Sequence, residues 1–311
     1  MGFVEWSISA QIPIFYLNIC ITIPSTALYI AEIVTIVRHK KFHNSFYALF
    51  VMRAIPDLLY VLNCFYGNRL PFIFGAVLYP IYSKFPNWML AMFYFIVAHT
   101  FQANNLVTIF ILLNRLTAII MPTKHEKLWR RCLSFITIFV LCVPILTCWP
   151  AFKMNVIIRL KDPNSTTGRI FSITEAGDEQ STTNYMMRID AVFTVIFLIL
   201  CVLLNICTFV AYKLHMKKVS INVGINFDDI KKKLLIYALT TFLGHAFVAS
   251  LFLIPIINNI DVTKTLTIMY IYLSLVIESG TVVLSSCQLE ELLAINTSVP
   301  FNNCRQFLLD L

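Results

Sequence analysis

The chain has 311 residues, of which 59% are hydrophobic and only 13% are charged, and its mean hydropathy is +0.77. Globular domains are about 45–50% apolar and about 25% charged, so this composition excludes an ordinary soluble protein. It indicates a chain whose partner is the lipid bilayer. The formal net charge of +8 comes from short loops between apolar segments, so it gives no reason to expect a nucleic-acid partner.

Seven apolar segments are each long enough to cross a membrane as an α-helix, which takes about 20 residues. In chain order they are 12–37, 45–66, 88–113, 133–152, 190–212, 234–257 and 266–287. The sequence therefore predicts an all-α membrane protein. Residues 1–311 are expected to form a single domain, a seven-transmembrane helix bundle followed by a tail at 288–311.

The distribution of Lys and Arg predicts the orientation of this bundle. The first, third and fifth loops are short, rich in Lys and Arg, and nearly free of acids. The positive-inside rule places such loops in the cytoplasm, so we expect the N-terminus outside and the C-terminus cytoplasmic. Asn164 begins the sequon Asn164-Ser165-Thr166 in the long polar loop 153–189, which is then external, and is the expected glycosylation site.

The second segment carries two opposite charges in the stretch FVMRAIPDLLY. Arg53 and Asp57 are one helical turn apart, and a charge at bilayer depth costs at least about 2.5–3.5 kcal/mol. We therefore expect an intramembrane pair, which either fixes helix packing or acts as a conformational switch. Pro56, between them, is expected to bend the helix. Glu32, near the end of the first segment, is expected to reach the membrane interface.

The third segment contains a polar stripe in VAHTFQANNLVTIF, formed by His99, Gln102 and Asn105 at three-residue spacing. Hydrogen bonds between membrane helices explain such a stripe, and His99 is also placed to touch a ligand from outside. Glu278, in the last segment, needs a partner on another helix, for which Arg53 and His245 are candidates. The expected ligand-binding residues are Trp88, Phe93, Tyr94, His99, Gln102 and Glu278.

No sequence pattern indicates an enzyme. The HExxH and GxSxG motifs are absent, and one isolated His per segment is weak evidence for a metal site, so we expect neither a cofactor nor a metal. Most of the nine cysteines lie in apolar segments, where a thiol behaves as a small apolar group. Cys64 and Cys148 are the one pair near the outer face that could form a disulfide.

The stretch ILLNRLTAIIMP closes the third segment. Asn114-Arg115-Leu116, followed by Ala118-Ile119 and Pro122, resembles the Asp-Arg-Tyr closure of rhodopsin-like G-protein-coupled receptors. A closer resemblance is to the nematode serpentine chemoreceptors of the class gamma and class V group. Four stretches carry it, distributed over most of the span 20–290: HNSFYALFVMRAIPDLLYVLNCFYGNR, FQANNLVTIFILLNRLTAIIMPTKHEKLW, LTTFLGHAFVAS and ESGTVVLSS.

This resemblance implies a chemosensory receptor in the plasma membrane of sensory neurons. Such a receptor detects a small external molecule and signals to a heterotrimeric G protein, and Asn114, Arg115 and Pro122 are then the coupling residues. The alternative is a seven-helix ligand-gated ion channel of the insect odorant receptor type, which has the opposite topology. Glycosylation of Asn164 separates the two hypotheses.

The chain departs from the rhodopsin-like pattern at several points. It has no Cys at the start of the third segment and none in the loop 153–189, so the usual disulfide cannot form. Cys-Trp-x-Pro and Asn-Pro-x-x-Tyr are also missing from the last two segments. Position 114 is Asn, so Arg115 lacks its acidic neighbour, and the tail 288–311 has a single basic residue.

Overall fold

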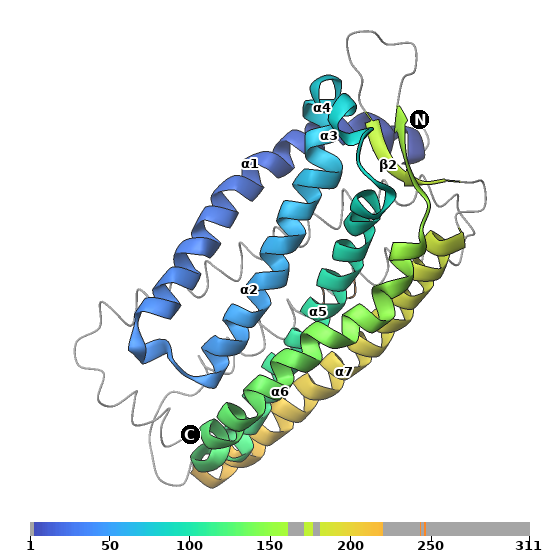
Figure 1. Ribbon diagram of the computed structural model, residues 1–311. Helices are drawn as coiled ribbons and strands as arrows, with labels where there is room; N and C mark the ends of the chain where they lie inside the picture. Colours follow the sequence, from blue (N-terminus) through green and yellow to red (C-terminus); the bar gives the residue numbers. More distant parts are fainter. Residues whose placement is uncertain (1–2, 161–170, 177–180, 220–242, 244–245, 247–311) are drawn as a thin grey trace.

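Five long helices dominate the computed structural model, which describes residues 3–160, 171–176, 181–219, 243 and 246 (Figure 1). Each is long and apolar enough to cross a membrane. They match the first five predicted segments, whereas the segments 234–257 and 266–287 and the tail 288–311 lie outside the described residues. The helices are α1 (Phe3–Arg38), α2 (Ser45–Cys64), α5 (Asn87–Ile120), α6 (Pro122–Cys148) and α7 (Ser181–Val219).

Most of these helices run further than the apolar segments that predicted them. α5 continues to Ile120 rather than stopping at 113, and α6 begins at Pro122 rather than at 133. Hydropathy marks where a chain leaves the apolar phase, whereas Lys, Arg and Glu extend a helix readily beyond that point. The break between α5 and α6 follows from Pro122, which is favoured as a first helical residue because it has no N–H to satisfy.

Helix α5 lies at the centre of the described bundle. It packs against α2, α6 and α7, while α1 packs against α2; Figure 1 shows α1 and α2 on one side of α5, and α6 and α7 on the other. Leu49 of α2 is buried with Ala103 and Val107 of α5. Large apolar side chains cover the outside, and Leu146 and Phe135 on α6 are 78% and 70% exposed, as lipid-facing residues are.

Short elements continue α2 toward the loop before α5. A π-helical turn (η2, Phe65–Arg69) follows α2 directly, and α3 (Leu70–Ile73) and α4 (Gly75–Tyr82) come next. A Cβ atom at Gly67 would overlap the ring of Phe93, so glycine is what allows η2 to approach α5 this closely. Two 3₁₀ turns, η1 (Lys40–Phe42) and η3 (Trp149–Lys153), complete the helical elements of the described chain.

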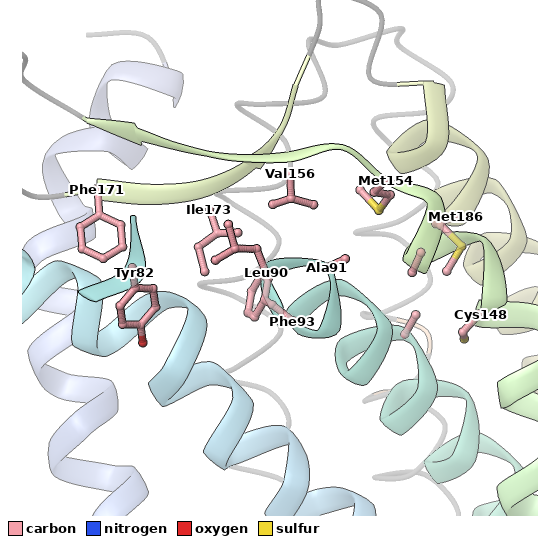
Figure 2. Close-up of a cluster of buried hydrophobic side chains, with 12 residues drawn as sticks. Tyr82, Leu90, Ala91, Phe93, Cys148, Met154, Val156, Phe171, Ile173 and Met186 are labelled. Carbon is pink, nitrogen blue, oxygen red and sulfur yellow. The ribbon is translucent and has the colours of Figure 1, made fainter. Parts of the chain in front are cut away.

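A β-hairpin, which the all-α prediction missed, caps one end of the bundle. β1 (Val156–Leu160) pairs antiparallel with β2 (Phe171–Glu175), with Val156 opposite Glu175. Figure 2 shows side chains of both strands pointing toward Tyr82 and Leu90 of the helical elements. The alternation of apolar and polar residues in FSITE is the strand signal, but five residues are too few to outweigh a polar loop. We call this end the hairpin end.

Hydrogen bonds from α5 tie the hairpin to the bundle. Asn87 Nδ2 donates to the Met154 carbonyl at 2.8 Å, and its Oδ1 accepts from the Val156 N–H at 2.7 Å. Tyr94 donates its hydroxyl to the Ile173 carbonyl at 2.9 Å. Cys64 and Cys148, the pair that could have formed a disulfide, are both free thiols.

Two further contacts fix the surroundings of the hairpin. Glu175 of β2 caps the first turn of α7, accepting from the Thr183 N–H at 2.9 Å and from the Thr182 N–H at 3.2 Å. Tyr82 donates its hydroxyl to the Tyr66 carbonyl at 2.8 Å, and burial raises the pKa of Tyr82 to about 12. This phenol therefore remains a hydrogen-bond donor at neutral pH.

Candidate functional site

Polar side chains gather at three places between the described helices. Two are buried carboxylates inside the bundle, which we call the Asp57 site and the Asp190 site. The third lies where α5 turns into α6, and we call it the Arg115 end. Asn87 is bonded to the hairpin, and Arg115 follows it by 28 residues of one helix, or about 42 Å. The Arg115 end is therefore opposite the hairpin end.

The Asp57 site joins three helices. Asp57 is 3% exposed, and Arg53 Nε lies 3.7 Å from its Oδ2 atom, in the arrangement expected for an intramembrane pair. Tyr29 of α1 donates its hydroxyl to Oδ2 at 2.9 Å, and Asn104 of α5 donates to Oδ1 at 2.7 Å. One turn further along α1, Glu32 is 5% exposed, so the expectation that it reaches the membrane interface is wrong. Glu32 and Tyr29 lie on the same buried face of α1.

The Asp190 site joins α5, α6 and α7. Asp190 of α7 is 9% exposed, and Gln102 of α5 donates from Nε2 to its Oδ1 at 2.9 Å. Gln102 is completely buried, and its Oε1 accepts a short hydrogen bond from Thr147 of α6. Thr194, one turn after Asp190, donates to the Asp190 carbonyl at 2.6 Å. Gln102 therefore lies in the interior, as its place in the polar stripe predicts.

The other predicted ligand-binding residues occupy separate positions. His99 Nε2 contacts the Leu141 carbonyl of α6 at 3.1 Å, which agrees with the helix-packing interpretation of the stripe. Phe93 is 2% exposed and packs edge-on against Tyr94, which lies under the hairpin. Trp88 is 58% exposed and does not join them. Glu278 lies outside the described residues, as do His245 and Asn164.

Trp88 instead lines a shallow groove between α2 and α5. The groove has a volume of about 300 Å³ and is bordered on α5 by Met89, Met92 and Ile96. Leu59 and Leu62 form the α2 side, and both are exposed apolar residues of a membrane helix. The groove therefore belongs to the lipid-facing surface, separate from the Asp190 site.

At the Arg115 end, the three residues of the predicted coupling motif are all in or next to helices. Asn114 is 2% exposed and donates from Nδ2 to Ser45 Oγ of α2 at 3.1 Å. The guanidinium carbon of Arg115 lies 5.3 Å from the centre of the Phe46 ring, within cation–π range. Pro122 starts α6. The motif thus joins α5 to the first turn of α2.

An acid from α6 completes this cluster. Glu126 accepts from the Ser45 hydroxyl at 2.8 Å and from the Ser45 N–H at 3.2 Å, at the positive end of the α2 dipole. It also accepts from Arg130 Nε at 2.8 Å. His125 contacts the Asn114 carbonyl at 3.1 Å. The acid at this end of the bundle is therefore on α6 instead of at position 114. Glu126 binds Ser45 at the start of α2, whereas an acid at position 114 would be next to Arg115.

Sequence reasoning missed Tyr29, Asn104, Asp190 and Glu126 as partners in these sites. For Asp190 a signal existed, because it is an isolated acid at the start of an otherwise apolar segment. Tyr29 and Asn104 gave none, since tyrosine and asparagine are common in membrane helices without any role. Within the described ranges, no three His, Cys, Asp or Glu side chains come together as metal ligands would.

Comparisons with known proteins agree with this architecture. A model of the Srg family of chemoreceptors matches residues 15–289. Serpentine receptor class gamma-16 of Caenorhabditis elegans is 31% identical over 134 residues, 41% of each chain. Serpentine receptor class gamma-15 is 26% identical, covering 49% of this chain and 48% of its own, and class gamma-2 is 24% identical, covering 54% and 51%.

The chain thus matches about half, or less, of the length of these curated relatives. The family model, by contrast, covers the five described membrane helices from within α1 onward and extends past them. It separates class gamma from class V, which the sequence motifs could not do. Chemoreceptors are not enzymes, and multiple apolar helices are consistent with a serpentine architecture. This chain belongs to the Srg family of chemoreceptors.

Proposed function

We propose that this protein is a G-protein-coupled chemoreceptor with seven membrane helices, an external N-terminus and a cytoplasmic C-terminus. It detects a small external molecule at the hairpin end and signals to a heterotrimeric G protein at the Arg115 end, in the plasma membrane of sensory neurons. Ligand binding shifts an equilibrium between two helix packings. The observation that carries the proposal is the family match over 15–289 of a chain whose central helix, α5, carries an Asn114-Arg115 motif in its last two turns.

The contacts at the Arg115 end support a coupling role. Glu126, Ser45 and Asn114 link α2, α5 and α6 through side chains, so a movement of α5 changes the surface that these helices share. Arg115 directly follows Asn114 on α5, and its guanidinium lies over the ring of Phe46 on α2. The planar guanidinium can form paired hydrogen bonds to a docked protein, which an ammonium cannot copy.

The test compares Arg115→Lys and Arg115→Ala with the wild type in ligand-stimulated nucleotide exchange on the G protein, at matched surface expression. Lysine keeps the charge and the cation–π contact, so folding and surface level are expected to stay normal while exchange falls at least about tenfold. Arg131→Lys is the matched control, because this exposed arginine of α6 lies near the same end. Full exchange by both Arg115 variants would reduce this arginine to a membrane-interface anchor.

Topology has an independent test. If the loop 153–189 is external, Asn164→Gln removes a glycan and increases the gel mobility of the expressed protein. Unchanged mobility, with the wild type glycosylated elsewhere, counts against the receptor orientation and in favour of the inverted topology of a channel.

A further inference from the structure

Asp190 is a buried acid that has no cation beside it within the described residues. It lies eight residues inside the membrane span Thr182–Leu214, or about 12 Å along α7 from the hairpin end. In the described part of the chain, the one hydrogen bond to its carboxylate comes from the Gln102 amide, and no Lys, Arg or His approaches it. An ionised carboxylate at such depth ordinarily faces the interior and is paired.

A second buried polar group, on α5, also has no hydrogen-bond partner among the described residues. Asn105 is 5% exposed, and its Nδ2 donor makes no hydrogen bond in the described part of the chain. Helices α5 and α7 run in the same direction, because Gln102 meets Asp190 and, further along both helices, Leu112 shares a buried cluster with Phe197 and Cys201. Asn105 precedes Leu112 by seven residues and so shares its face of α5, at the height of the turn of α7 that follows Asp190. A buried donor without an acceptor loses about 1–3 kcal/mol of solvation.

The carboxylate of Asp190 and the amide of Asn105 bind complementary chemical groups. The carboxylate of Asp190 accepts hydrogen bonds and favours a positive charge, whereas the amide of Asn105 donates to an oxygen or another acceptor. Gln102 and Thr147 already satisfy one another, so they hold the carboxylate in place rather than compete for it. The rise from Gln102 to Asn105 is about 4.5 Å, which is short enough for one small molecule to reach both groups.

We infer that Asp190 binds the ammonium group of the ligand, and that the ligands of this receptor include small amines with a hydrogen-bond acceptor close to the nitrogen. This assignment rests on the proposed function and names the ligand class of that receptor. The ammonium supplies the charge that Arg53 supplies to Asp57. Asn105 then donates to the acceptor of the same molecule.

The test uses the purified full-length chain in detergent and measures its Tm with pairs of probes that differ only in charge. The pairs are butylamine with 1-butanol, 4-aminobutan-1-ol with butane-1,4-diol, and 2-phenylethylamine with 2-phenylethanol, at millimolar concentrations. At least one amine is expected to raise the Tm by about 2 °C or more above the effect of its alcohol. The same amine is expected to have no such effect on Asp190→Asn, which keeps the acceptor for Gln102 but removes the charge.

Glu175→Gln is the matched control, since it removes a negative charge from the same end of α7 outside the bundle, and it should keep the wild-type response to the amine. The inference is overturned if no amine exceeds its alcohol, or if Asp190→Asn responds like the wild type. Because this measurement needs no G protein, its failure is distinct from a failure of coupling. If the wild type and Asp190→Asn signal equally to the same uncharged compound and neither responds to an amine, the proposed receptor function stands and the cation site is overturned.

Discussion

The Asp57 site and the Asp190 site are built alike on opposite faces of α5, and they differ in one component. Each is a carboxylate less than a tenth exposed, and each accepts a hydrogen bond from an α5 amide, Asn104 in one case and Gln102 in the other. Asp57 also has Arg53 and Tyr29. The chain therefore neutralises Asp57 by itself but leaves Asp190 without a cation in the described residues.

Under the proposed function, this difference separates a region that fixes helix packing from a region that responds to ligand. The packing of α1, α2 and α5 around Asp57 has its charges balanced internally, so a ligand has little to add there. Around Asp190, α5, α6 and α7 meet at a charge that an external cation can balance. A change in that balance alters the contact between α5 and α7, and α5 continues to the Arg115 end.

The largest expected effect is at the Asp57 site. Asp57→Ala strands Arg53 in the bundle and removes the acceptor of Tyr29, and breaking a buried pair costs about 3–5 kcal/mol. We expect surface expression and the Tm in detergent to fall sharply. The double variant Arg53→Ala with Asp57→Ala removes both charges and should recover part of the loss. A double variant as unstable as the single one, or worse, would contradict pairing.

Removing the amide donors tests how much each carboxylate depends on its neighbour. Gln102→Leu removes the single donor to Asp190 in the described chain and the acceptor of Thr147, so a loss of about 1.5–3 kcal/mol is expected. Asn104→Leu is expected to cost less, because Arg53 and Tyr29 still hold Asp57. Thermal unfolding of both variants gives the order, and an equal loss would mean that the two sites are satisfied to the same degree.

The helices that carry the two aspartates, α2 and α7, also differ in how their first turns are capped by residues outside them. Glu175 caps α7, and Glu126 binds the first turn of α2, where Asn44 caps as well by accepting from the Tyr47 N–H at 3.1 Å. Glu175→Ala should therefore cost about 0.5–2 kcal/mol and accelerate hydrogen exchange at Thr183. Glu126→Ala should accelerate exchange less at the start of α2. The reverse order would show that the cap of Asn44 contributes little.

The smallest expected effect is that of removing the charge at the Asp190 site. Asp190→Asn keeps an oxygen for Gln102 and removes a charge that has no counter-charge in the described chain. The free energy of unfolding should therefore fall by less than about 1 kcal/mol, or rise. Asp57→Asn, in contrast, leaves Arg53 without an anion and should be clearly destabilising. The comparison fails if Asp190→Asn is as destabilising as Asp57→Asn.

Sequence patterns predicted much of the architecture and only part of each site. The pairing of Arg53 with Asp57 was accessible because both lie on one helix, where a four-residue spacing fixes the geometry. Tyr29 and Asn104 come from other helices, and no local spacing relates them to Asp57. The polar stripe on α5 likewise identified Gln102 as inward-facing, but it could not name Asp190, and it placed His99, which contacts the α6 backbone, in the same group.

The amino-acid sequence by itself determined that this is a membrane protein of long apolar helices and, through its motifs, a serpentine chemoreceptor, because hydrophobicity and local spacing are properties of single segments. The tertiary structure decided which polar groups meet. The hairpin over α5 and the caps at Glu126 and Glu175 depend on contacts between residues distant in the chain, as do the balanced charge at Asp57 and the unbalanced one at Asp190. Such contacts are set by how helices pack, and packing has no signature within one segment.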